Sequence, residues 1–446
     1  MTAPVSERRR REVIDALRRG TVPRSGLDLL AVGLDRFEAA IEAELDTVVS
    51  GGSVFKAVRG EYGAGKTFFT RWLAERAKRL GLATAEVQIS ETETPLHRLE
   101  TVYRRICDNL ATPQFPPSAL RPVLDAWIYT LEEDVLAAGQ IAETDAPALD
   151  TAVADLMERR LGEIARSAPT FAAAVRGYRA ATASGDLPTA EGLAAWIGGQ
   201  PNVAAAVRRS AGVKGELDHF GALGFLQGLL AVLRGCGHPG LLVVLDEVET
   251  VARMRSDVRD KALNALRQLL DEVDSGRFPG LYLVITGTPA FFDGTQGAQR
   301  LSPLAQRLAT DFSIDARFDN PRAVQLRLPG FSADGLRELG RRVREIFTAG
   351  GAAGERVAAV VDDGYLDLLA DRVTGQLGGK VGVAPRIFLK KLVVDVLDRV
   401  ELHPDFDPRR DYPVTLVAGE LTDIERNAAG LAVRSVDDID LDVGLP

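Results

Sequence analysis

A glycine-rich segment of eight residues, Gly60–Thr67, constrains the fold of this chain more than any other part of the sequence. It reads Gly-Glu-Tyr-Gly-Ala-Gly-Lys-Thr and matches G-x-x-x-x-G-K-[ST], the Walker A phosphate-binding loop. A strand-like run over residues 53–59 precedes it, and a helical pattern opens at residues 68–73. A strand, this loop and a helix N-terminus in that order predict a nucleotide-binding site. The alternative is a glycine-rich turn with an incidental lysine.

The loop also predicts which atoms hold the nucleotide. Its glycines allow a tight turn in which backbone N–H groups approach phosphate oxygens. We expect Lys66 to reach the β- and γ-phosphates of ATP and Thr67 to place its hydroxyl on Mg²⁺. The nucleotide-binding residues predicted here are Gly60, Glu61, Tyr62, Gly63, Ala64, Gly65, Lys66, Thr67 and Phe68.

A second motif, of the Walker B type, lies far downstream. Residues 240–245 form a continuous apolar run, as expected for a strand buried on both faces of a parallel sheet, and Asp246-Glu247 follows it. We expect Asp246 to hold Mg²⁺ through water and Glu247 to orient and deprotonate the attacking water. The glutamate directly after the aspartate favours a hydrolase over a kinase. The alternative is an acidic pair that begins a loop or caps the next helix.

The next apolar run, residues 280–286, ends in Thr286-Gly287-Thr288. In the additional-strand class of ATPases a polar residue here contacts the γ-phosphate or positions the water. Thr286 is the candidate and Thr288 the second choice. An ordinary strand-end threonine is the competing interpretation, since threonine suits strands.

Three arginines are candidates for contact with the γ-phosphate. Arg300 and Arg307 follow the threonine-ended strand, where an arginine could act as a finger in trans on a neighbouring subunit. A solvated helix face with salt bridges explains both equally well. Arg386 begins a helix near the C-terminus and could reach the nucleotide of its own subunit, or lie on the surface.

The pattern of the whole chain predicts an α/β fold of the P-loop NTPase type, with a parallel sheet, a large helical insertion and a C-terminal helical lid. We expect an N-terminal helical segment over 1–50, an ATP-binding core over 51–320 with the insertion at about 95–233, a lid over 321–400 and a loop-rich acidic tail over 401–446. The expected elements are helices at 8–19, 35–49, 261–273, 332–347, 364–375 and 385–400, and strands at 83–90, 240–245 and 280–286.

The order of these motifs resembles the AAA+ ATPases, particularly their origin-recognition-like branch. Residues 16–23, 31–34, 58–67, 88–96 and 245–250 more closely resemble the BrxD-type ATP-binding proteins of BREX bacteriophage-defence systems. The resemblance extends from about residue 8 to about residue 400. It implies an ATPase that acts with other BREX proteins, including a helicase, on DNA, and that uses Lys66, Thr67, Asp246 and Glu247 at its nucleotide site. An arginine finger in trans implies a homo-oligomer.

The composition bears on disulfides, metal sites, membrane association and nucleic-acid binding. The two cysteines, Cys107 and Cys236, lie far apart and the four histidines form no ligand pattern, so a disulfide framework or a zinc site is not expected. No apolar run approaches the roughly 20 residues that span a bilayer, and no signal peptide is evident, so we expect a cytoplasmic protein without a membrane partner. The net charge of −9 argues against extensive nucleic-acid coating but allows a local basic groove. The alternative function is a slow nucleotide-dependent switch or scaffold without motor activity on DNA.

Overall fold

The computed structural model describes residues 6–139, 141, 144–349, 353–379, 382 and 385–428. The chain divides into two compact units. The sheet unit comprises Phe37–Arg59 and Leu73–Arg327, and the lid unit comprises Met1–Arg36, Gly60–Trp72 and Leu328–Pro446. Residues 429–446 of the expected acidic tail lie outside the described residues.

A parallel sheet of five strands organises the sheet unit, in the order β2-β3-β4-β1-β5. Its strands are β1 (Val54–Arg59), β2 (Ala83–Gln88), β3 (Leu241–Asp246), β4 (Leu281–Gly287) and β5 (Gln325–Arg327). Every residue of β3 and β4 is buried, which explains their continuous apolar sequences. Strand β4 lies between β1 and β3, the arrangement of the additional-strand class, so the predicted fold class is confirmed.

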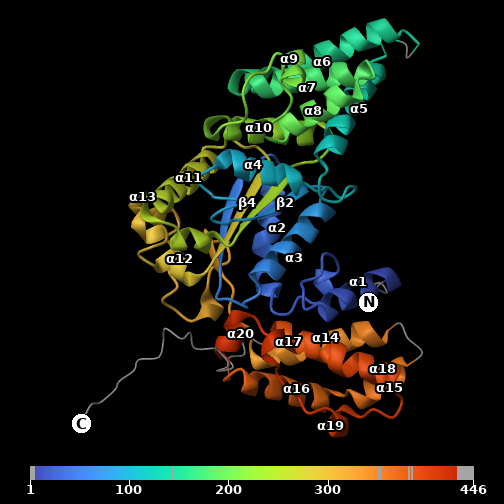
Figure 1. Ribbon diagram of the computed structural model, residues 1–446, viewed down its shortest axis with the longest axis vertical. Coiled ribbons are helices and arrows are strands. Elements are labelled where there is room, and N and C mark those ends of the chain that lie inside the picture. The colour runs from blue at the N-terminus through green and yellow to red at the C-terminus, as the bar shows by residue number, and fades with distance from the viewer. Residues whose placement is uncertain are drawn as a thin grey trace. The chain divides into compact units, whose positions relative to one another are not determined.

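Helices cover the sheet and also build the insertion between β2 and β3. The helix before β1 is α2 (Asp35–Val49), and α3 (Lys66–Arg79) follows the loop after β1. The insertion contains α4 (Leu99–Asp108), α5 (Leu120–Ala137), α6 (Ala146–Ser167), α7 (Pro169–Ala183), α8 (Leu187–Ile197), α9 (Ala205–Ser210) and α10 (His219–Gly235). Helix α4 packs on β2, α10 packs on α4, and the other helices of the insertion lie beyond them (Figure 1).

Phe225 of α10 ties the insertion together. Its ring makes edge-to-face contacts with Tyr103 of α4, Phe171 of α7 and Trp196 of α8, at centroid distances of 5.7, 5.3 and 5.4 Å. Such pairs add about 0.5–1.5 kcal/mol each beyond the area that they bury. The buried residues of the insertion and those of the sheet belong to one hydrophobic core.

The segments after β3 and β4 are mostly helical. They are η2 (Val248–Arg253), α11 (Ser256–Asp274), α12 (Pro289–Asp293), η3 (Ala298–Arg300), α13 (Ser302–Arg307) and η4 (Ala316–Phe318). Helix α11 begins five residues before the predicted start at residue 261.

The lid unit has its own core, in which α1 (Glu7–Arg18) packs against the C-terminal helices. Those helices are α14 (Ala333–Thr348), α15 (Gly354–Val360), α16 (Asp363–Gln376), α17 (Pro385–Lys390), the π-helical turn η6 (Lys391–Leu397) and α18 (Asp398–Leu402). The short segments η1 (Leu27–Leu29), α19 (Pro408–Asp411), η7 (Ala418–Glu420) and α20 (Asp423–Ala428) complete the unit. The predicted helical lid is confirmed, but α15 was not anticipated and the expected helix at 385–400 contains a π-helical turn.

Candidate active site

The Walker A loop joins β1 to α3 as the sequence predicts. The Nζ atom of Lys66 donates hydrogen bonds to the carbonyl oxygens of Gly60 at 2.8 Å and Glu61 at 3.2 Å. Lys66 is 8% exposed, and its ammonium lies 5.2 Å from the ring centroid of Tyr62. The ammonium is thus held inside the loop, next to the backbone that the motif assigns to phosphate.

The three glycines of the loop cannot be replaced without strain. Gly63 has a φ angle of +82°. Gly65 has a φ angle of +88°, a conformation that side-chain-bearing residues rarely adopt. A Cβ atom on Gly60 would lie 3.1 Å from the Cβ of Ala64 and 3.4 Å from the Cβ of Leu328. The backbone conformation and the close contacts of the loop therefore require glycine at these positions. Glycine also lets the backbone approach a phosphate group closely.

Asp246 is the last residue of β3 and is 7% exposed. Its Oδ1 atom accepts hydrogen bonds from the backbone N–H of Glu247 at 3.1 Å and from the hydroxyl of Thr286. A carboxylate fixed in this way at the carboxyl edge of a parallel sheet is a suitable oxygen ligand for Mg²⁺, directly or through water.

Glu247 adopts the left-handed conformation, with φ 60° and ψ 42°. Few residues other than glycine do so, and such strained positions cluster at functional sites. Its carboxylate oxygen Oε2 accepts a hydrogen bond of 3.0 Å from the side-chain amide of Gln88 at the end of β2. Gln88 was not singled out from the sequence. The available signal was a polar residue that ends a strand pairing with β3.

Thr286, at 0% exposure, bridges the two acidic residues. Its Oγ1 atom donates to Asp246 and accepts from the backbone N–H of Glu247 at 3.2 Å. Thr288 is 5% exposed and precedes α12 as its N-cap residue, without a side-chain capping bond. Thr286 therefore positions the two acidic residues in this structure.

Strand β1, which leads into the loop, is fixed at its end by Arg59. This residue pairs with Gly287 in the register of β1 and β4. Its guanidinium forms an ion pair with Asp293 and lies 4.7 Å from the ring centroid of Phe312. The ion pair and the ring contact of Arg59 therefore fix the end of β1, from which the Walker A loop begins.

The two candidate finger arginines are both bound to carboxylates of α11. Arg300 forms a bidentate pair with Asp260, and the guanidinium lowers the pKa of that carboxyl group. Arg307 pairs with Asp271 at 2.5 Å and with Asp274 at 2.8 Å. This placement is the salt-bridged helix face that the sequence analysis kept as its alternative, and a role in trans requires these pairs to open.

Arg386, on α17 of the lid unit, is also paired. Its Nε and Nη2 atoms donate to the two carboxylate oxygens of Glu425, with a distance of 2.9 Å for Nε. Nη2 also donates to the carbonyl oxygen of Glu420 at 2.7 Å. The Glu425 side chain is 4% exposed, so the pair is largely desolvated on the carboxylate side. Contact of Arg386 with a nucleotide would compete with Glu425.

Thr67 carries a hydroxyl and Asp246 a carboxylate, and both are oxygen donors of the kind that Mg²⁺ takes. Within the described ranges, no group of three or more His, Cys, Asp or Glu side chains is arranged to hold a metal ion. None of the described helices is long and apolar enough to cross a membrane.

Comparison with known proteins identifies one family. The family model for the BREX system ATP-binding protein BrxC/D matches residues 5–415. Among solved structures, the chain matches the Aeropyrum pernix ORC2 protein in its ADPNP-ADP complexes, with 14% sequence identity and a TM-score of 0.41. That match covers 89% of this chain and 66% of the ORC2 chain, so this chain spans slightly less than two thirds of its length. No relative was found among curated proteins.

Proposed function

The chain belongs to the BrxC/D family of BREX system ATP-binding proteins, and from this premise we propose that it hydrolyses ATP. The observation that carries the proposal is the arrangement of Asp246 and Glu247 at the end of β3. One carboxylate is fixed by Thr286, and the other is presented from a left-handed backbone and held by Gln88. This arrangement supports a division of labour between a metal-binding aspartate and a base.

Nucleotide binding is assigned to the Walker A loop. The backbone N–H groups of residues 60–68 bind phosphate oxygens, and Lys66 exchanges its two carbonyl partners for the β- and γ-phosphates. Because Lys66 already lies within the loop and is largely buried, little side-chain entropy is lost when it binds phosphate.

Hydrolysis is assigned to the strand ends. Thr67 and Asp246 are the proposed ligands of Mg²⁺, which supplies charge neutralisation at the phosphates. Glu247 orients a water molecule and accepts its proton. Gln88 and Thr286 are proposed as positioning residues: Gln88 holds the Glu247 carboxylate, and Thr286 holds Asp246 together with the Glu247 backbone.

The arginines carry the proposal of self-association. Arg307 or Arg300 would act in trans after leaving its partner on α11, and Arg386 would act in cis after leaving Glu425. An arginine in trans requires a homo-oligomer. The family assignment supports action with other BREX proteins. We further propose that these partners include a helicase and that the protein acts on DNA in the cytoplasm.

A second candidate function is a slow nucleotide-dependent switch. The hydrogen bond from Gln88 to Glu247 favours it, because the Glu247 carboxylate oxygen that Gln88 occupies is not free to orient a water molecule. In this version ATP binding changes partner affinity, and turnover is slow in the absence of a partner.

Steady-state ATP hydrolysis with and without DNA tests these proposals. The unmutated protein is compared with Lys66→Ala and with Arg159→Ala, which removes an exposed cation of α6 as a matched control. We expect hydrolysis that DNA stimulates, loss of activity in Lys66→Ala, and full activity in Arg159→Ala. Negligible turnover in every condition together with ATP-dependent partner binding would select the switch. Failure of the unmutated protein to bind ATP would contradict both functions.

A further inference from the structure

An exposed aromatic ring and several basic side chains gather where three helices of the sheet unit begin. We call this surface the aromatic–basic patch. It consists of residues at the starts of α4, α10 and α11: His97, Arg98, His219, Phe220, Arg255 and Lys261.

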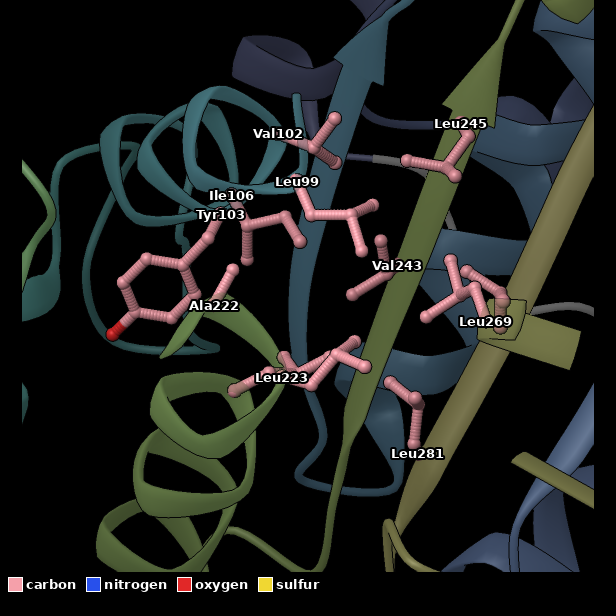
Figure 2. Close-up of a pocket in the computed structure, with 12 residues that line it drawn as sticks. Leu99, Val102, Tyr103, Ile106, Ala222, Leu223, Val243, Leu245, Leu269 and Leu281 are labelled. Atoms are coloured by element: carbon pink, nitrogen blue, oxygen red, sulfur yellow. The ribbon is translucent and has the colours of Figure 1, made fainter. Parts of the chain in front are cut away.

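Packing holds the first two helix starts together. The ring atom Nδ1 of His219 accepts a hydrogen bond of 3.5 Å from the backbone N–H of Leu99. Leu99 of α4 and Ala222 of α10 line the same apolar cavity. Figure 2 shows it together with lining residues from β3 and α11. This cavity measures about 30 Å³, room for little more than a water molecule, so it is a packing gap too small for a ligand.

Phe220 presents its ring to solvent. The residue is 84% exposed, and its ring meets that of His219 edge to face at a centroid distance of 5.5 Å. Burying a phenylalanine side chain is favourable, so leaving this one outside gives up stabilisation. A ring in this position is available for a partner that stacks on it.

The basic side chains of the patch are not neutralised. Within the part of the chain that the structure describes, Arg98, Arg255 and Lys261 are exposed and form no ion pair, whereas Arg300 and Arg307 are both bound to carboxylates. The pKa of His97 is lowered first by burial and then by the positive charges of Arg98 and Lys261, so both charges lie within electrostatic range of His97.

Acidic residues also lie near the patch. Asp218 is engaged as the N-cap of α10, where its Oδ1 accepts from the backbone N–H of Gly221 at 2.8 Å. Glu100 and Asp257 lie in the first turns of α4 and α11. The cations therefore do not form a broad positive surface. Arg98 and Lys261 act on His97, and His219, whose ring meets Phe220, bonds the start of α4. This combination suits a partner that offers both a flat apolar face and discrete negative charges.

The patch lies at the same edge of the sheet as the acidic pair. His97 and Arg98 belong to the segment after β2, whose first residue, Ile89, donates its backbone N–H to the carbonyl of Asp246 at 2.9 Å. Arg255 follows β3 after the short helix η2.

We propose that the aromatic–basic patch binds single-stranded nucleic acid, with a base stacked on Phe220 and backbone phosphates on Arg98, Arg255 and Lys261. Single strands expose both the base face and the phosphates, whereas the bases of a duplex stack on one another and cannot cover the ring. This proposal specifies the nucleic acid on which the protein is proposed to act, and it rests on that proposed function. Binding of the strand itself requires no ATP hydrolysis. A few unpaired cations at one surface are compatible with the net charge of −9.

Fluorescence anisotropy of labelled oligonucleotides, without nucleotide, tests the patch independently of ATPase activity. The probes are a 20-nucleotide oligothymidylate, an oligouridylate of equal length and a duplex. The variants are Phe220→Ala and the double variant Arg98→Ala/Lys261→Ala. Phe318→Ala is the matched control, because Phe318 is 65% exposed and adjoins Arg317, whose charge is paired with Asp315. Circular dichroism checks that each exposed substitution leaves the fold intact.

We expect Phe220→Ala to weaken binding of a single strand about 5- to 150-fold, the range that corresponds to loss of one stacked base. The double variant should lower the slope of log K against log salt by about 1.4, since each phosphate contact on a single strand contributes about 0.7. Phe318→Ala should bind as the unmutated protein does. Preference for the thymidylate or the uridylate would identify the strand as DNA or RNA.

Three results would overturn the proposal. The first is that the unmutated protein, while still hydrolysing ATP, binds no oligonucleotide at low salt, which would leave an acidic protein as the partner to seek. The second is equal weakening by Phe318→Ala. The third is duplex binding that matches single-strand binding and does not respond to Phe220→Ala. Loss of ATP hydrolysis with intact oligonucleotide binding would count against the proposed ATPase function and leave the patch standing.

Discussion

Replacing Thr286 with valine removes the hydroxyl that bridges the two acidic residues and keeps the shape of the side chain. In the structure this hydroxyl donates to the Asp246 carboxylate and accepts from the backbone N–H of Glu247 at 3.2 Å. Thr286 is fully buried and Asp246 is 7% exposed, so water cannot readily replace the lost bonds.

The expected cost follows from these two bonds. A buried hydrogen bond to a charged group contributes about 1.5–3 kcal/mol, and a bond to a neutral group about 0.5–1.5 kcal/mol. The N–H of Glu247 keeps its 3.1 Å contact with Asp246, so its share lies at the low end. Thr286→Val should therefore lower the free energy of unfolding by about 2–4 kcal/mol. Thr286→Ser keeps the hydroxyl and loses one methyl group, at a cost of about 1 kcal/mol.

Urea unfolding of the three proteins measures these costs, and ATP hydrolysis measures the positioning role. We expect Thr286→Ser to retain most of the activity and Thr286→Val to lose most of it, because Asp246 and Glu247 are no longer aligned. Equal stability of the valine variant and the unmutated protein would refute the bridging role. Equal activity of the two variants would refute the positioning role.

Further predictions concern stability and reactivity. Glu425→Ala leaves Arg386 without its carboxylate and should lower the free energy of unfolding by about 2–3 kcal/mol, with a coupling to Arg386→Ala that a double-mutant cycle detects. Gly228→Ala places a Cβ 2.5 Å from an aromatic ring and should destabilise by about 1–3 kcal/mol, whereas Gly162→Ala, with open space around it, should stabilise by up to about 1 kcal/mol in thermal unfolding. Burial raises the pKa of Cys236 to about 11, so its thiol should react with iodoacetamide at pH 8 about 100-fold more slowly than free cysteine. The same shift stabilises the folded chain below about pH 9, and this contribution is lost as pH rises toward 11. If the Cys236 thiol reacted as fast in the folded protein as in the urea-unfolded protein, the predicted protection by burial would be wrong.

Much of the fold follows from local sequence. The apolar runs at 240–245 and 280–286 predict β3 and β4 because both faces of these strands are buried. The Walker A loop was recognised because a short segment dictates its own backbone, including the left-handed glycine at 65. The short strand β5 and helix α15 were harder to predict, since three or seven residues carry little periodic signal.

The partners of the charged residues could not be read from the sequence. Gln88 reaches Glu247 because β2 pairs with β3, which brings together residues 159 positions apart in the chain. Arg307 and Arg386 were singled out by position, but the carboxylates that hold them come from distant helices. Such contacts depend on tertiary packing, so their roles in catalysis stay proposals.

Comparison of ATP binding with ATP hydrolysis in the Glu247→Gln variant tests the central claim most directly. Isothermal titration measures binding, and phosphate release under Mg²⁺ measures hydrolysis. We predict that the unmutated protein hydrolyses ATP, and that the variant binds ATP with the same affinity but releases phosphate about 10²- to 10⁴-fold more slowly, the share of a general base. Phosphate release by Glu247→Gln at the rate of the unmutated protein would contradict the assignment of Glu247 as the base.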